Sequence, residues 1–256
     1  MKLKKPKYSI VIPAYKEAKI IEQSLKTLAT YLVSTKIMDV CEVIVVCADA
    51  PDHTKVLVSK CASLFWSLKL IEPGKKVGKG RDVRAGIMEA RGTYVLFTDA
   101  DLATPVEHIL PAFNVLEEGA DVVIGIRELN DIHIGIRKWV SLVANSTSRL
   151  LISPSVADTQ CGFKGFSARA AKKLFNKQTI MGWAFDMEIL FLARKMGFDV
   201  RTIGIPDWTE NKLPEDQLVG ESNLKAAVRT FSEVLQIRWR YLKGAYNLTR
   251  KKTVRK

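Results

Sequence analysis

The segment Tyr94-Val95-Leu96-Phe97-Thr98-Asp99-Ala100-Asp101 joins four apolar residues to two carboxylates that flank one small residue. A run this apolar predicts a strand that is covered on both faces, as in a parallel sheet. Two neighbouring acidic side chains at the end of such a strand are costly unless a cation compensates them. The segment therefore predicts a core strand of an α/β protein, with a charged site at its carboxyl end.

Short apolar runs of the same kind recur along the chain and alternate with stretches of helical spacing. The pattern from Thr104 to Glu107 is typical of a capping box, with Pro105 at the first helical position. The alternation predicts a mostly parallel central sheet with helices on both faces. Strands are expected at residues 8–13, 43–46, 68–71, 94–97, 121–125 and 200–205, and a loop from 158 enters a short strand near 165.

The composition indicates an ordinary globular protein. Of the 256 residues, 47% are hydrophobic and 26% are charged, which excludes a disordered chain. The four cysteines have no C-x-x-C spacing, so neither a zinc site nor a disulfide framework is expected. Reduced thiols, no signal peptide and no apolar run of about 18 residues favour a cytoplasmic location, with any membrane contact peripheral.

The formal net charge of +13 predicts an anionic partner: nucleic acid, an anionic membrane or a phosphorylated small molecule. The basic residues are spread along the chain without a nucleic-acid-binding motif, so no nucleic acid is expected. We divide the chain into a main α/β domain, 1–215, and a basic amphipathic C-terminal helix and tail, 216–256. The helix expected at 222–246 has two interpretations, contact with an anionic bilayer or packing on the domain with a solvated basic face.

Ligands of parallel sheets bind outside the carboxyl ends of the strands. Asp99 and Asp101 there suit a hard divalent ion, Mg²⁺ or Mn²⁺, that also binds substrate phosphates, although a turn before a helix would also explain them. The basic glycine loop at 74–81 could fold over a pyrophosphate or be a solvated loop, and it lacks the Walker pattern. Arg127, at a strand end, suits bidentate phosphate binding better than Arg137 does.

Two further segments, 158–164 and 183–188, place polar residues beside aromatic ones. Such loops suit sugar recognition, because apolar sugar faces stack on rings and carboxylates accept hydroxyl hydrogen bonds. The plainer interpretation of each segment is a turn and a capped helix.

Taken in order, the motifs resemble the family-2 glycosyltransferases with the GT-A nucleotide-sugar-binding fold. Within that family the chain resembles the polyprenyl-phosphate sugar transferases, in particular their dolichyl-phosphate β-glucosyltransferase branch. The resemblance covers about residues 8–210 and rests on 11–17, 78–80, 92–94, 99–102, 158–164 and 183–188.

The resemblance implies a role for each matching residue. Mg²⁺ or Mn²⁺ would be held by Asp99 and Asp101, and the catalytic residues would be Asp158, Asp101 and Arg127. The acceptor would contact Arg137, Trp183 and Asp186. The donor nucleotide would be bound by Pro13, Ala14, Tyr15, Glu17, Asp49, Lys79, Asp99, Ala100 and Arg127.

The implied reaction is an inverting, metal-dependent transfer of a hexose, with glucose favoured, from a nucleotide sugar to a polyprenyl or dolichyl phosphate. UDP-glucose is the favoured donor and GDP-mannose the alternative, because residues 47–52 depart from the family's Asp-Asp-Gly-Ser segment. Ala103-Thr104 replaces a further metal ligand found in many members. A hydroxyl acceptor would require Asp158 as a base, whereas a lipid phosphate would need it only for positioning. Nucleotidyl transfer is disfavoured, because residues 13–17 contain no glycine loop, and non-enzymatic binding is a third alternative.

Overall fold

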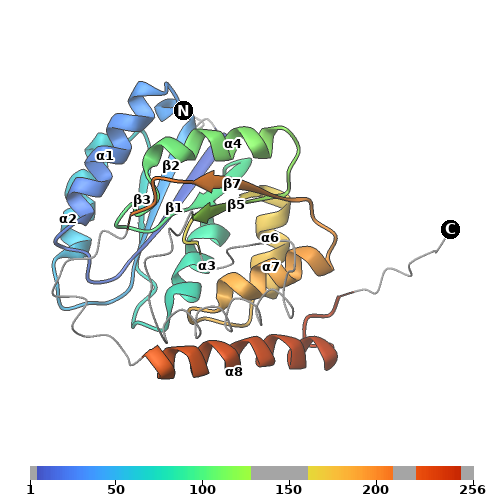
Figure 1. Ribbon diagram of the computed structural model, residues 1–256. Helices are drawn as coiled ribbons and strands as arrows, with labels where there is room; N and C mark the ends of the chain where they lie inside the picture. The colour runs from blue at the N-terminus through green and yellow to red at the C-terminus, as the bar shows by residue number, and fades with distance from the viewer. Residues whose placement is uncertain (1–4, 128–160, 210–222, 249–256) are drawn as a thin grey trace.

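The computed structural model describes residues 5–127, 161–209 and 223–248, which contain one sheet of seven strands (Figure 1). The strands are β1 (Tyr8–Ala14), β2 (Cys41–Cys47), β3 (Leu68–Ile71), β4 (Tyr94–Phe97), β5 (Val122–Arg127), β6 (Lys164–Ser167) and β7 (Val200–Ile205). Their order is β3-β2-β1-β4-β6-β5-β7, and only β6 runs antiparallel to its neighbours. The predicted α/β fold with a mostly parallel sheet is confirmed.

Helices cover both faces of this sheet, as predicted. Against one face pack α1 (Ile21–Ser34), α2 (Thr54–Lys60) and α4 (Ile109–Glu117), and against the other α3 (Lys79–Glu89), α6 (Ala168–Lys177) and α7 (Phe185–Lys195). The C-terminal helix α8 (Asn223–Leu242) lies along the outside of α7 (Figure 1). Short 3₁₀ helices complete the described elements: η1 (Met38–Val40), η2 (Cys61–Leu64) and η3 (Val106–His108).

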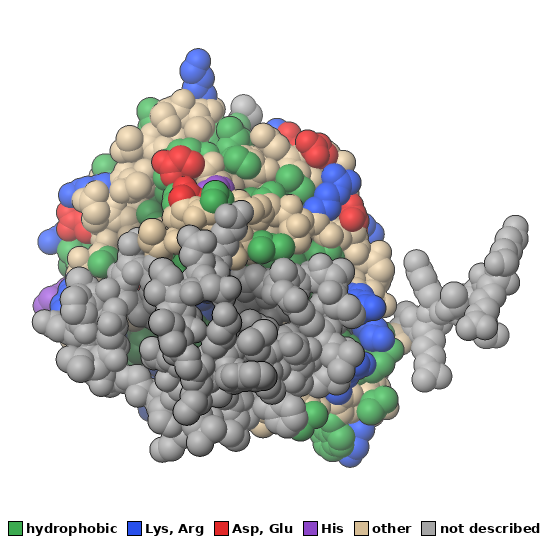
Figure 2. All heavy atoms as spheres, in the orientation of Figure 1, with side chains coloured by type: hydrophobic (Ala, Val, Ile, Leu, Met, Phe, Trp, Pro, Cys, Tyr) green, Lys and Arg blue, Asp and Glu red, His purple; other side chains and the backbone are tan. Residues whose placement is uncertain are grey.

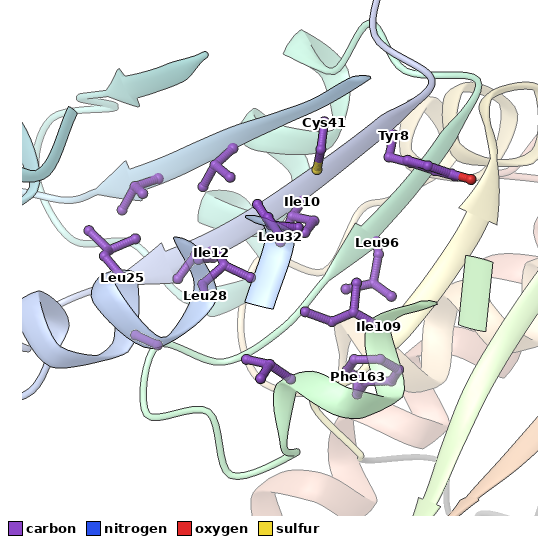
Figure 3. Packing of buried hydrophobic residues seen from close by; sticks show 14 of the residues in the cluster. Tyr8, Ile10, Ile12, Leu25, Leu28, Leu32, Cys41, Leu96, Ile109 and Phe163 are labelled. Carbon is purple, nitrogen blue, oxygen red and sulfur yellow. The ribbon is translucent and has the colours of Figure 1, made fainter. Parts of the chain in front are cut away.

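The central strands β1, β2, β4 and β5 are mostly apolar because both of their faces are buried along most of their length. Along β1, Ile10 and Ile12 enter the core with α1, and Val11 enters the core on the opposite face. Figure 3 shows Ile10 and Ile12 beside Leu28 and Leu32 of α1. Full burial of one such side chain contributes about 1.5–3 kcal/mol relative to exposure. The two cores together therefore fix the strand ends from which the site is built.

The short strand β6 is the part of the sheet that alternation alone does not predict. It is inserted between β4 and β5 and pairs with both, Leu96 with Gly165 and Val123 with Gly165. A side chain at Gly165 would meet Val123 at 2.7 Å, so the position requires glycine. The insertion brings residues 161–163, which precede β6, next to the carboxyl end of β4.

The capping box expected at Thr104 does not form. Thr104 is buried, and the chain enters the 3₁₀ helix η3 after Pro105 without a side-chain cap. The turn after β4 is held instead by Asp101, whose Oδ1 accepts a hydrogen bond from the Ala103 amide at 3.1 Å. The α-helix that follows therefore begins only at Ile109. The turn before it is set by Asp99-Ala100-Asp101, which we call the acidic segment.

The C-terminal helix packs on the domain along part of its length. Ile237 and the later Tyr246 are buried, and the Tyr241 ring meets that of Phe191 of α7 edge-on at 5.2 Å. The helix ends at Leu242, four residues before the end expected from the sequence. Packing on the domain is thus confirmed for these residues, whereas the division at 215 stays a prediction. Among the described helices, none combines the length and the apolarity that a bilayer crossing requires.

Candidate active site

The sequence-predicted donor residues lie at the carboxyl ends of neighbouring strands. Pro13 and Ala14 end β1, and Tyr15 and Glu17 form the turn that follows. The other members of the set are Asp49, after β2; Asp99, Ala100 and Asp101, after β4; Arg127, the last residue of β5; and Lys79, the first residue of α3.

Lys79 and Asp99, with Asp101 beside them, form the centre of this group, which we call the charged centre. The Lys79 Nζ lies 2.5 Å from Asp99 Oδ1, and both side chains are largely covered, at 13% and 33% exposed. Burial disfavours the ammonium charge, but Asp99, Asp186 and Asp101 outweigh it, so the pKa of Lys79 is raised. Lys79 is therefore a permanent cation against the acidic segment.

Asp101 is the second carboxylate of the acidic segment. Burial, and then the neighbouring charge of Asp99, raise the pKa of Asp101 above its usual range, although the Ala103 amide acts against this. A second cation in addition to Lys79 would relieve that excess of negative charge.

The acidic segment fits a divalent ion of the predicted kind. The described residues contain no group of three or more His, Cys, Asp or Glu side chains arranged for a metal. Mg²⁺ commonly keeps one or two carboxylate ligands and completes its shell with phosphate and water, so Asp99 and Asp101 suit such an ion. This fit agrees with the absence of a further ligand at Ala103-Thr104.

The glycine loop between β3 and α3 is an ordered structure rather than a freely solvated one. Arg81 donates to the carbonyl oxygens of Pro73 and Lys75 at 2.7 and 2.8 Å. Asp82, buried beneath the loop, pairs with Arg81 at 2.8 Å and with Lys76 at 3.1 Å. Arg81 is thus committed to shaping the loop, whereas Lys79 is the loop's cation at the acidic segment.

The turn after β1 is tied to the start of α2. The hydroxyl of Thr54 accepts from the Glu17 amide at 2.9 Å and donates to Asp52 at 2.6 Å. Tyr15 follows β1 directly, and the ammonium of Lys76 lies 4.5 Å from its ring centre. The glycine loop and the β1 turn therefore meet at Tyr15.

Asp49 lies at the far end of the same edge. Its amide donates to the Gly74 carbonyl at 2.9 Å, which joins the β2 loop to the glycine loop. Its carboxylate pairs at 2.7 Å with Lys55, which also pairs with Glu72. In segment 47–52, which differs from the family's Asp-Asp-Gly-Ser, Asp49 is thus the exposed carboxylate. Asp52 instead holds the turn after β1, because it accepts a hydrogen bond from the Ala18 amide.

Two of the predicted residues, Arg127 and Trp183, lie beside aromatic or charged groups rather than in the acidic segment itself. The Arg127 guanidinium lies 4.9 Å from the Trp208 ring centre, a contact that the sequence did not suggest. Trp183 is 62% exposed, and the Lys79 ammonium lies 5.3 Å from its ring centre. Trp183 is therefore an open aromatic surface beside the charged centre. Asp158 and Arg137 fall outside the described residues.

Asp186, which was predicted to contact the acceptor, is deeply buried in this structure. It is 4% exposed and pairs at 2.8 Å with Lys164, which is fully buried in β6. Burial raises the pKa of Asp186, although Lys164 and Lys79 oppose this. Acceptor contact by Asp186 stays a prediction, and in this structure the carboxylate is covered and paired with Lys164.

Gly162 is a site residue that motif matching did not explain. A Cβ built on it would lie 2.0 Å from Asp99 Oδ2 and 2.6 Å from Asp99 Cγ. The backbone before β6 thus forms one wall of the Asp99 pocket and admits no side chain. The sequence did contain a signal for the nearby buried Lys164. It is a single lysine between Phe163 and Phe166 in an otherwise apolar run.

The charged centre, the glycine loop and the acidic segment occur together on a sheet of this order. The family model of Glycosyl transferase family 2 matches residues 9–175. The chain belongs to this family, which confirms the resemblance found in the sequence.

Among curated proteins, dolichyl-phosphate beta-glucosyltransferase ALG5A of Trichomonas vaginalis is 32% identical over 216 residues, which are 79% of this chain and 65% of that protein. Dolichyl-phosphate beta-glucosyltransferase of Homo sapiens is 31% identical over 260 residues, 94% of this chain and 77% of that protein. The chain spans slightly less than two thirds of the length of the first relative.

Among solved structures, glucosyl-3-phosphoglycerate synthase from Mycobacterium tuberculosis, in complex with Mn²⁺, uridine diphosphate and phosphoglyceric acid, superposes with a TM-score of 0.64. The match covers 90% of this chain and 78% of that one at 19% identity. The likeness shows the shared GT-A fold.

Proposed function

We propose that this chain transfers a hexose, with glucose favoured, from a nucleotide sugar to dolichyl or another polyprenyl phosphate. The observation that carries the proposal is the charged centre, Lys79 on Asp99 beside Asp101, at the carboxyl edge of a parallel sheet. The similarity to dolichyl-phosphate beta-glucosyltransferases supports dolichyl phosphate as the acceptor and a glucosyl group as the sugar. UDP-glucose is the favoured donor, with GDP-mannose as the alternative.

The donor's diphosphate would be held from both sides of the charged centre. Lys79, already a cation, would move from Asp99 to a phosphate oxygen, and Arg127 would bind the diphosphate as a planar donor. Asp99 and Asp101 would hold Mg²⁺ or Mn²⁺, which when bound would supply positive charge against the leaving nucleoside diphosphate. Charge stabilisation by groups already in place commonly gives the largest part of a rate enhancement.

The transfer itself needs little proton chemistry when the acceptor is a phosphate. An oxygen of the lipid phosphate forms the new bond to the anomeric carbon while the bond to the nucleoside diphosphate breaks on the opposite face, which inverts the anomeric centre. Because a phosphate monoester has its second pKa at roughly 6, the attacking oxygen is already largely anionic near neutral pH. Asp158 would then position the reactants rather than remove a proton.

Peripheral contact with an anionic membrane is the second part of the proposal. Leu235, Trp239 and Leu242 are spaced four and three residues apart, so they share one face of α8, and all three are exposed. The Lys243 ammonium lies 3.9 Å from the Trp239 ring centre. In Figure 2 hydrophobic and basic side chains lie together at the lower right, where Figure 1 shows the C-terminal end of α8. Such a face suits a bilayer interface, where the acceptor lipid resides.

The transfer is tested with radiolabelled UDP-glucose and GDP-mannose, each offered dolichyl phosphate or unphosphorylated dolichol, with Mn²⁺ or with a chelator. We expect label in the organic phase only with UDP-glucose, dolichyl phosphate and metal, and none with Asp101→Asn. Transfer to dolichol alone would favour a hydroxyl acceptor. Release of a sugar 1-phosphate instead of a nucleoside diphosphate would replace the proposal with nucleotidyl transfer.

The membrane part is tested separately by co-sedimentation with vesicles that contain anionic lipid. We expect binding at low salt that weakens as salt is added, and about a ten-fold loss in the double variant Trp239→Ser/Leu242→Ser. Val33→Ser/Val56→Ser is the matched control, because both side chains are exposed on other helices. Equal binding by the two double variants would remove α8 as the contact surface.

A further inference from the structure

A fully buried carboxylate lies away from the charged centre, and the reaction above does not use it. Glu188 of α7 is 0% exposed. It accepts hydrogen bonds from the Thr179 amide at 2.9 Å, the Ile180 amide at 2.8 Å, the Thr179 hydroxyl and the Tyr246 hydroxyl at 2.7 Å. Burying a charge is expensive unless it is hydrogen-bonded this fully, so the arrangement fixes both of the segments that supply the donors.

One of these segments is the end of the C-terminal helix and the turn after it. Tyr246 reaches Glu188 from beyond α8, and Lys177 donates to the Tyr246 carbonyl at 2.7 Å. Arg240, within α8, donates to the Thr179 hydroxyl at 2.5 Å. Residues 237–246 are thus bonded to the segment that joins α6 to α7.

That joining segment supports the start of α3. The Gln178 amide group donates to the Gly80 carbonyl at 2.9 Å, and the Arg81 amide donates to the Met181 carbonyl at 3.2 Å. A Cβ on Gly78 would lie 2.2 Å from the same Met181 carbonyl. The backbone on either side of Lys79 therefore rests directly on residues 178–181.

We propose that Glu188 and Tyr246 are positioning residues that hold Lys79, and with it Trp183, in place from the C-terminal segment. The chain of contacts runs from Tyr246 to Glu188, through the backbone of 179–181, to the first turn of α3. The consequence for nucleotide binding rests on the function proposed above. Since a displacement of about 1 Å in a positioning contact commonly costs 10²-fold in rate, even modest loosening of this support is measurable.

Tyr246→Phe is the decisive variant, because it removes one hydroxyl and keeps the buried ring. The matched control is Tyr31→Phe in α1, whose hydroxyl accepts from the Leu110 amide at 3.2 Å on the opposite face of the sheet. Both variants are compared for melting temperature, for affinity towards UDP with Mn²⁺ by calorimetry, and for amide hydrogen exchange. Thr179→Val, which removes the hydroxyl between Glu188 and Arg240, is the second variant.

We expect Tyr246→Phe and Thr179→Val to weaken UDP binding about ten-fold, the size of effect that loss of one hydrogen bond to a charged group commonly has. The Arg81 amide should exchange faster by a similar factor without any ligand, and Tyr31→Phe should change neither quantity. Unchanged Arg81 exchange in both variants would overturn the positioning role. If exchange rises as expected but the wild type binds no nucleotide, the proposed function fails and the positioning role stands.

Discussion

Gly162→Ala gives the sharpest test of the charged centre, because it displaces one carboxylate and little else. The added Cβ would lie 2.0 Å from Asp99 Oδ2, whereas ordinary contacts begin at 3.4 Å. The Asp99 carboxylate must therefore move by more than an ångström. It is the end of a short side chain that is one-third exposed, so the fold should tolerate the shift. The same shift should lower kcat/KM by about 10²-fold, equal to about 2.7 kcal/mol of transition-state stabilisation.

The assay measures transfer from UDP-glucose to dolichyl phosphate, with the melting temperature recorded in parallel. Gly204→Ala is the neutral control, because a Cβ there has no atom within 4 Å. Gly165→Ala is the structural control, because its Cβ would press on the core at Val123 and lower the melting temperature. If Gly162→Ala keeps kcat/KM within about three-fold of the wild type while folding normally, the position of Asp99 does not matter and the site is misassigned.

Three more sets of variants test Lys79, Asp101 and the buried ion pair between Lys164 and Asp186. Lys79→Met should lower kcat/KM by about 10²–10³-fold in the transfer assay, because it removes one preorganised charge-stabilising group. Lys79→Arg should keep part of the activity. Full activity in Lys79→Met would exclude Lys79 from donor binding. Because the native pKa of Asp101 is raised, the folded wild type binds a proton more readily than the unfolded chain and gains stability only as the pH falls through that pKa. Asp101→Asn should therefore raise the melting temperature by about 2–4 °C at neutral pH, and calorimetry should find this gain shrinking at acidic pH; a gain that grows on acidification would contradict the charge argument. Lys164→Met should lower the free energy of unfolding in urea by about 3–5 kcal/mol, because it leaves the Asp186 carboxylate buried without its partner. Lys164→Met/Asp186→Leu should regain most of that loss. A double variant as unstable as Lys164→Met would contradict a buried ion pair.

Local sequence patterns predicted most of the fold because burial on both faces leaves a plain signal. The apolar run at 43–46 became the fully buried strand β2, whereas the mixed run at 200–205 became the partly exposed edge strand β7. The antiparallel insertion of β6 was not predicted, because strand order depends on pairing between residues far apart in the sequence. The capping box at Thr104 failed for a related reason: Thr104 is buried, and the Asp101 carboxylate holds the preceding turn.

The sequence predicted which residues lie at the carboxyl edge of the sheet, but not which of them contact one another. Strand ends placed Asp99 and Lys79 on one edge, which follows from parallel topology, but their direct pairing depends on the ordered glycine loop. Asp186 was expected at the acceptor because its motif lies beside Trp183. Its pairing with Lys164 was not predicted, because the sequence did not reveal where the strand β6 lies. The restriction at Gly162 is likewise a contact between distant segments and leaves no local pattern.

The placement of β6 has a consequence for how the protein is made. In the described sheet, β4 is joined to β5 only through β6, so β1–β4 and the later strand β5 stay separate until residues 164–167 arrive, and β7 pairs with β5 afterwards. A nascent chain that stops before this point carries an open edge strand at β4, with the hydrogen-bonding groups of Tyr94–Phe97 available to any passing strand. Long-range closure of this kind is slow, and fragments cut before residue 164 should aggregate rather than fold.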